Sequence, residues 1–155
     1  MSDDEDMRSE VRVYLAFGGF DFDPDEITRL TGITPTKTLR AGDPVSWASS
    51  LSEENRQRIR VKSNRWEVDS GLDSSVDLPT HVKALLQKLE PVWDRFVELG
   101  QQYEPVMECI VSSYGGDRPE IFFDKEVIRK LIQLNAEIDV DLYVFRSSSA
   151  PLETK

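Results

Sequence analysis

The chain repeats one hydrophobic pattern three times: a β-like apolar run, an aspartate, and then a short amphipathic helix. The pattern occupies residues 17–30, 74–89 and 120–134. Alternation of apolar and polar residues predicts a strand, whereas apolar residues spaced three and four apart predict a helix. The repetition therefore predicts an α+β domain in which helices pack on a sheet. It specifies no chemistry.

Strand patterns lie between and around these helices. Strands are predicted over residues 11–17, 34–43, 56–68 and 140–145, and residues 105–123 are predicted to form a hairpin that turns at Gly115–Gly116–Asp117. The resulting order is β-α-β-β-α-β-β-α-β, and its first six elements have the order of a ferredoxin-like unit. Strands with one apolar face favour a mostly antiparallel sheet with helices on one face.

Start and stop signals support the three helices. Asp23 and Glu26 are spaced as a capping box, with Pro24 in the first turn and Gly32 as the stop. The second helix is the longest, and we expect a kink at Pro91. For the third helix we expect Asp124 as the cap and a core-facing stripe of apolar residues. That stripe consists of Val127, Ile128, Leu131 and Ile132.

Length and composition are those of one globular domain. At 155 residues and 39% hydrophobic content, the chain is large enough for a core without disulfides. We expect a single domain over residues 11–146, with disordered tails at 1–10 and 147–155. A single cysteine, the absence of a membrane-length apolar run, and an acidic N-terminus together predict a cytoplasmic protein with no membrane association.

The charge distribution contains one reversal. The chain carries a net charge of −10, which argues against nucleic-acid binding. Residues 55–65 nevertheless hold five bases and no acid. As a strand, residues 56–62 would align their bases on one face, where they could bind an anion. We therefore treat as candidate ligand-binding residues Lys37, Arg40, Arg58, Arg60, Lys62 and Trp66. The alternative is that these charges protect an exposed strand from aggregation or pair with the acidic tail.

Few residues are suited to catalysis, and we assign no catalytic residue. His81 is the only histidine and is expected on a helix surface, without a serine or cysteine motif beside it. Cys109 lies among apolar neighbours and is expected to be buried and inert. No nucleotide-binding or zinc-binding motif occurs.

Two aspartate groups have a spacing reminiscent of metal ligands. Asp21, Asp23 and Asp25 begin like a calcium loop, but Glu26 stands where the loop needs glycine and Gly32 where it needs glutamate. Asp69, Asp73 and Asp77 are better explained by a polar loop. We expect no metal and no cofactor.

Several fragments in order resemble an uncharacterised bacterial group, domain-of-unknown-function family 4279. They are residues 13–43, the segment RWEVDSG around Trp66, the DLPTHVKALLQKLEP helix, and the closing IDVDLYVF. Together these fragments span residues 11–146. The resemblance implies a compact α+β domain in a bacterial cytoplasm, and it implies no catalytic or binding residue.

Three functional hypotheses follow. The first is a non-enzymatic binding module, an immunity-type inhibitor whose acidic surface meets a basic protein partner. The second is an enzyme or binding protein for an anionic small molecule, using the basic segment Arg56–Lys62. Charge reversal of Arg58 and Arg60 would abolish binding only in the second case. The third is a homodimer built on an exposed strand.

Overall fold

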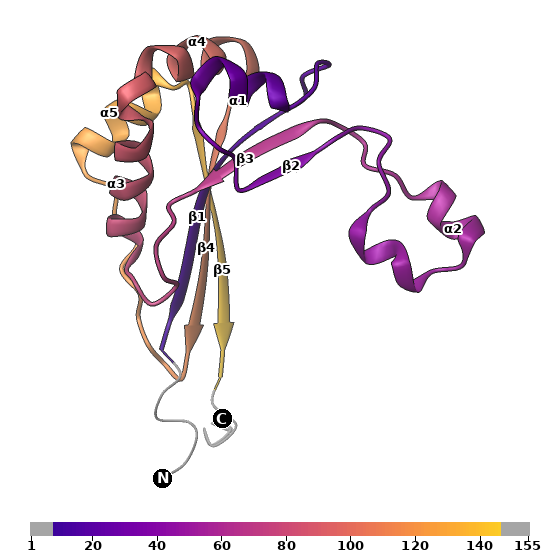
Figure 1. Cartoon of the computed structure of the whole chain (residues 1–155). Helices are drawn as coiled ribbons and strands as arrows, with labels where there is room; N and C mark the ends of the chain where they lie inside the picture. Colours follow the sequence, from indigo (N-terminus) through magenta and orange to yellow (C-terminus); the bar gives the residue numbers. More distant parts are fainter. Residues whose placement is uncertain (1–7, 147–155) are drawn as a thin grey trace.

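The computed structural model describes residues 8–146, which form one sheet covered by helices on one side (Figure 1). Of the predicted disordered tails at 1–10 and 147–155, residues 1–7 and 147–155 lie outside the described residues, and Glu10 belongs to β1. The elements in chain order are β1 (Glu10–Gly18), α1 (Asp25–Thr31), β2 (Lys37–Leu39), a 3₁₀ helix (Ser46–Ser50), α2 (Glu53–Arg58), β3 (Arg65–Asp69), α3 (Leu78–Leu89), a 3₁₀ turn (Glu90–Val92), α4 (Trp93–Tyr103), β4 (Val106–Tyr114), α5 (Lys125–Gln133) and β5 (Glu137–Phe145).

The sheet has five strands in the order β2-β3-β1-β4-β5. Only β4 and β5 are parallel, so the prediction of a mostly antiparallel α+β fold is confirmed. Strand β3 lies between β1 and β2, which is the arrangement of a split βαβ unit. The ferredoxin-like start is therefore present, and β5 extends it at one edge.

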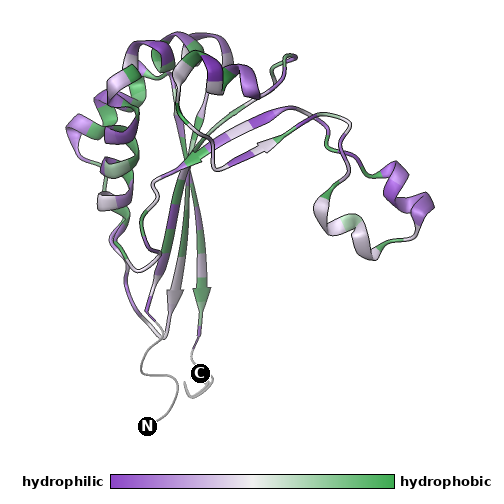
Figure 2. Cartoon of the chain, in the orientation of Figure 1, coloured by the Kyte–Doolittle hydropathy of each residue, from purple (hydrophilic) through white to green (hydrophobic). Residues whose placement is uncertain are grey.

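The core lies between the sheet and the helices. Alternate residues of β1 point into it, as the sequence predicts, and Val13, Leu15 and Phe17 are buried. Strand β4 alternates in the same way through Met107, Cys109 and Val111. Their partners on the helices form apolar stripes that Figure 2 shows as bands of hydrophobic colour. The other face of the sheet carries no helix (Figure 1).

The predicted break at Pro91 is confirmed. Helix α3 ends at Leu89, a 3₁₀ turn contains Pro91, and α4 restarts at Trp93. Proline lacks the N–H that would continue the helix. Asp124 caps α5 as expected, because its carboxylate accepts the Val127 N–H at 2.9 Å.

Two details of the predicted helices are wrong. Asp23 does not form a capping box, because its carboxylate accepts the Asp25 N–H and Glu26 pairs with Arg29 instead. Ile128 and Ile132 do not face the core. They are 44% and 71% exposed, because α5 is turned so that its Val127 side packs inward.

The predicted hairpin at residues 105–123 is also wrong. Strand β4 ends at Tyr114, and the chain after Gly115–Gly116 reaches α5 without forming a strand. Helix α5 then crosses back, so β5 pairs with β4 in parallel rather than as the next antiparallel strand.

The predicted strand over residues 56–68 is only half present. Residues 65–68 belong to β3, residues 56–58 belong to α2, and between them Arg60 forms an isolated bridge with Pro44. Ser52 caps this helix, Glu53 and Glu54 lie in its first turn, and its last turn carries Arg56 and Arg58. Acids at the start and bases at the end complement the helix dipole. Residues 41–64, which we call the arm, project from β2 and β3 on the side away from the other helices (Figure 1).

Candidate functional site

The six predicted ligand-binding residues do not converge. Lys37 is exposed on β2. Arg40 pairs with Asp23 and Asp25, and Arg58 pairs with Glu54 on α2.

The other three lie elsewhere. Arg60 and Lys62 belong to the arm, where Arg60 bridges to Pro44. Trp66 has no exposed surface, and its indole N–H donates to the Thr28 hydroxyl at 3.0 Å. An enclosed, satisfied indole cannot stack on a ligand from solvent. Of the six, Lys37 lines a cleft on the sheet.

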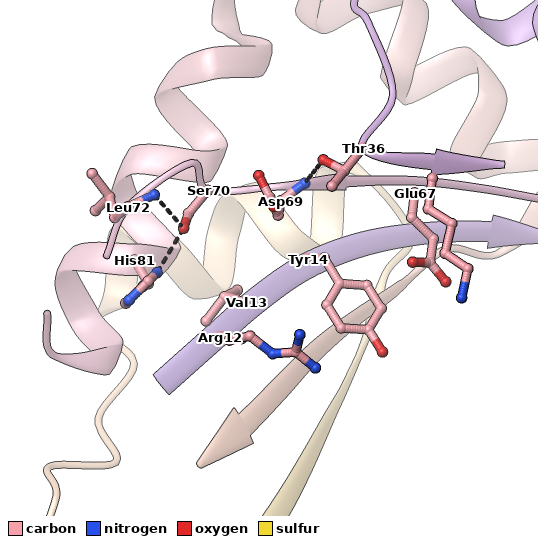
Figure 3. Close-up of a pocket in the computed structure, with 10 residues that line it drawn as sticks. Arg12, Val13, Tyr14, Thr36, Glu67, Asp69, Ser70, Leu72 and His81 are labelled. Atoms are coloured by element: carbon pink, nitrogen blue, oxygen red, sulfur yellow. Dashed lines mark hydrogen bonds between the residues drawn. The ribbon is translucent and has the colours of Figure 1, made fainter. Parts of the chain in front are cut away.

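That cleft has a volume of about 380 Å³ and lies where β2 ends beside β1 and β3. Figure 3 shows its residues converging from β1, β2, β3 and the first turn of α3. Its cations are Arg12 and Lys37, its acids are Glu67 and Asp69, and Tyr14 lies between them. Within residues 8–146, neither Arg12 nor Lys37 forms an ion pair closer than 4.0 Å.

His81 forms part of the cleft wall, so its predicted position on a helix surface is wrong. His81 is 1% exposed, and its Nδ1 lies 2.6 Å from the Ser70 hydroxyl oxygen. Its Nε2 lies 3.0 Å from the Asp73 carbonyl oxygen, which can only accept. Nε2 therefore carries the proton, and Nδ1 accepts from Ser70 (Figure 3).

A serine bonded to a histidine is the arrangement that activates nucleophiles, but here the surrounding donors are occupied. The Gly71 N–H donates to the Asp69 carboxylate, and the Leu72 N–H donates to the Ser70 oxygen. Neither is available to stabilise an oxyanion beside Ser70. We therefore interpret the Ser70–His81 hydrogen bond as structural: it holds the loop after β3 against helix α3.

An ionic network borders the cleft. The Arg65 guanidinium pairs with Glu67 and lies 2.7 Å from Glu108 on β4. Burial lowers the pKa of Arg65, but its hydrogen bonds to Glu108 and Glu67 outweigh this and raise that pKa above its ordinary value. Burial, followed by the Glu108 carboxylate, raises the pKa of the Tyr14 hydroxyl, which stays protonated. Because Arg65 is shared between Glu67 and Glu108, the cleft and its border together hold three cations and three carboxylates: Arg12, Lys37 and Arg65 against Glu67, Asp69 and Glu108.

The helix-free face of the sheet, which we call the open face, is acidic on its β5 side. Register pairs Tyr14 with Glu108 and Glu108 with Asp139, so the three point the same way. The same alternation places Asp141, Tyr143 and Phe145 on this face. Tyr143 and Phe145 are 52% and 46% exposed, and Phe145 stacks on Tyr114 with ring centroids 4.9 Å apart.

We call this surface the acidic–aromatic strip. Its members are Glu137, Asp139, Asp141, Tyr143 and Phe145 on β5, with Glu108 and Tyr114 on β4.

The family model for the domain of unknown function DUF4279 matches residues 9–145. The chain belongs to this family. Comparison with curated proteins gave no significant match, and neither did comparison with solved structures. The description of the DUF4279 family names no activity.

The aspartates of this DUF4279 domain that suggested metal ligands serve local structure. Asp77 caps α3 by accepting the Thr80 N–H, and Asp73 accepts the N–H and hydroxyl of Ser75. Over residues 8–146 no group of three metal-binding side chains occurs. Cys109 is buried as expected, and burial raises the pKa of its thiol to about 12. No helix in this described range has the length and apolar composition for crossing a bilayer.

Sequence reasoning missed Arg12, Ser70 and His81 as neighbours. Arg12 occupies a polar position of β1, which indicates its face but not what lies beside it. Ser70 and His81 are eleven residues apart, and no motif links them. Only the loop after β3 brings them together.

Proposed function

We propose that the chain is a non-enzymatic binding module of a bacterial cytoplasm, an immunity-type inhibitor that meets a basic protein partner with the open face of its sheet. The observation that carries this proposal is the acidic–aromatic strip. It combines carboxylates with exposed rings on a face that no helix covers.

The two halves of the strip suit two stages of binding. Acids such as Asp139 and Asp141 raise the rate of encounter with a cationic surface. Aromatic side chains such as Tyr143 and Phe145 often contribute much of the binding energy once water has been excluded from the interface. The net charge of −10 favours the same class of partner.

The open face has a suitable size. Three strands of nine residues, with β3 of five and β2 of three, spaced ~4.8 Å apart with a rise of ~3.3 Å per residue, give a surface on the order of 500 Å². A standard protein–protein interface buries ~800 Å² per partner. The arm projects beside the open face (Figure 1) and would contribute the remaining contact.

We predict that the double substitution Asp139→Asn and Asp141→Asn abolishes retention of a basic partner in pull-downs from the native cytoplasm. The retained protein should bind the unchanged chain with an affinity that falls steeply from low to physiological salt, because exposed charges are screened over about 10 Å. Calorimetry with the retained protein measures both effects.

A matched control removes the same two charges from the helix side. Asp94→Asn with Glu98→Gln changes exposed residues of α4, and binding should persist. Equal loss in both double variants would mean that total charge, and not the open face, determines binding. An affinity independent of salt would contradict the proposal.

A second candidate function is binding of a small anion, because the cleft holds Arg12 and Lys37 without ion pairs among the described residues. In the hypothesis drawn from the sequence, the basic segment Arg56–Lys62 binds an anionic small molecule. In the structure-based form of that hypothesis, the cleft is the binding site instead. Carboxylate and phosphate groups are the ligands that such cations bind through charge-assisted hydrogen bonds.

We predict that inorganic phosphate or citrate shifts the amide NMR signals of Thr36 and Ser70, and that Arg12→Gln with Lys37→Gln removes these shifts. The control is Arg58→Gln with Arg60→Gln, which removes two charges from the arm and should leave the shifts in place. Shifts that survive loss of Arg12 and Lys37, or that concentrate in the arm, would refute binding at the cleft.

A further inference from the structure

Strand β5 leaves one edge of the sheet unpaired in the described part of the chain. It is last in the strand order, nine residues long, and pairs with β4 without interruption. Proteins usually protect such an edge with proline, charged side chains, a bulge or a short strand. The β5 sequence EIDVDLYVF contains no proline and its register has no bulge, and its three acids lie within its first five residues, 137–141. The edge is therefore able to pair with another strand.

The hydrogen bonds of β5 show which groups are free. The Glu137 N–H donates to the Pro105 carbonyl, and the Phe145 carbonyl accepts from the Gly115 N–H, so both residues point toward the β4 side. Along a strand, the N–H and C=O of alternate residues point to opposite edges. The N–H and C=O of Ile138, Val140, Leu142 and Val144 therefore point to the free edge.

The same residues present apolar side chains. Register with Met107, Cys109 and Val111 places them on the helix side of the sheet. Yet Leu142 and Val144 are 52% and 66% exposed, because no helix extends over them.

Leu142 and Val144 therefore give the free backbone edge exposed apolar surface on the helix side of the sheet.

We propose that a second copy of the chain occupies this edge, with the two β5 strands antiparallel about a two-fold axis at Leu142. A two-fold axis perpendicular to the sheet keeps the helix layers of both copies on the same side of the joined sheet. An even-numbered residue of one β5 then faces an even-numbered residue of the other, and an odd-numbered residue faces an odd-numbered one. Pairing Leu142 with Leu142 and Val140 with Val144 joins the free groups in about six hydrogen bonds.

Charge and the number of hydrogen bonds together select this register. A register centred on Tyr143 sets no acid against an acid, but it joins the free groups of β5 in about four hydrogen bonds instead of six. Centring the axis on Asp141 would set Asp141 against itself, and centring it on Val140 would set Asp139 against Asp141. Like charges directly opposite each other destabilise a strand pair. Centring on Leu142 places Asp141 opposite Tyr143 and Asp139 opposite Phe145, without an acid facing an acid.

The dimer would join two five-stranded sheets into one of ten strands and make the two open faces continuous. This inference does not depend on the proposed function, because the isolated chain tests it without a partner.

We expect light scattering after size exclusion to give twice the chain mass of 17.7 kDa for the unchanged protein. Leu142→Lys should return the mass to that of one chain, because two ammonium groups would then meet at the axis. Circular dichroism should show that the variant remains folded, since the Leu142 backbone groups do not bond to β4. The control Leu30→Lys, at an exposed apolar position of α1, should remain dimeric.

Crosslinking tests the register. Opposed residues in a hydrogen-bonded pair have Cα atoms ~5.5 Å apart, within the range that a disulfide spans. Leu142→Cys should therefore form a covalent dimer on mild oxidation, whereas Val140→Cys should not, and buried Cys109 should remain reduced. A single-chain mass at all concentrations, a folded Leu142→Lys variant that stays dimeric, or preferential crosslinking at position 140 would each overturn the proposal.

Discussion

Replacing Gly100 with alanine is expected to lower the free energy of unfolding by on the order of 3 kcal/mol, or to prevent folding, because it overfills a closed contact. Gly100 is buried near the end of α4, against the last turn of α5. A Cβ at this position would lie 2.8 Å from the Leu134 carbonyl carbon and would overlap its oxygen. Both atoms belong to the backbone, so no side-chain rotation relieves the overlap.

The sign of this effect is opposite to that expected from helix propensity. Within a helix, alanine is ordinarily about 1 kcal/mol more favourable than glycine. The two helices are also held together here, since the Asn135 side chain donates to the Gly100 carbonyl at 3.1 Å. Separating them to admit a methyl group would break that bond.

Chemical denaturation of Gly100→Ala measures the loss. Gly18→Ala is the matched control, because the nearest atom to its Cβ is 3.8 Å away and its φ is not positive. The control should change stability by less than about 0.5 kcal/mol. A Gly100→Ala variant as stable as the unchanged chain would mean that α4 and α5 do not touch at this point.

The second large effect is expected from Trp66→Ala, which should cost about 3–5 kcal/mol. Trp66 has no exposed surface and packs against Phe17 and Phe96, with ring centroids 6.2 and 6.0 Å away. Truncation would leave a cavity and an unpartnered Thr28 hydroxyl. Thermal unfolding followed by circular dichroism measures the cost.

Trp47→Ala is the control for the same truncation. Trp47 lies in the arm and is 61% exposed, so its loss should change stability by less than about 0.5 kcal/mol. If Trp66→Ala kept full stability but lost ligand binding, Trp66 would be a site residue, as the sequence suggested. Similar costs for the two tryptophans would contradict the assignment of Trp66 to the core.

Most predictions that depended on short-range patterns were confirmed, and the capping box of Asp23 and Glu26 is the exception. The alternation in β1 places Val13 and Leu15 in the core, Asp124 begins α5, and Pro91 separates α3 from α4. Each signal acts within about four residues, because pleating, capping and the missing proline N–H are local properties of the backbone.

Predictions that required knowledge of a distant partner were wrong. Residues 56–62 alternate as a strand would, yet their pairing in the arm stops at the isolated bridge of Arg60 to Pro44, and capping by Ser52 favours α2 over residues 53–58. The segment after Gly116 similarly has β-like residues but no strand partner. Intrinsic β preference is weak unless cross-strand neighbours supply the packing.

The candidate site shows the same division. Lys37 and Arg12 are recognisable as polar positions on strands, but their convergence on one cleft depends on the order β2-β3-β1. The burial of His81 depends on a loop that brings Ser70 to it.

By itself, the sequence determined the fold class, the main strands and helices, the acidic character and the scarcity of catalytic motifs. These follow from composition and from periodicities of two and 3.6 residues. Only the tertiary structure decided which tryptophan is core, which side of α5 is exposed, and which strand is left with a free edge. Such properties depend on contacts between residues far apart in the chain. Burial and strand pairing arise only when folding brings those residues together.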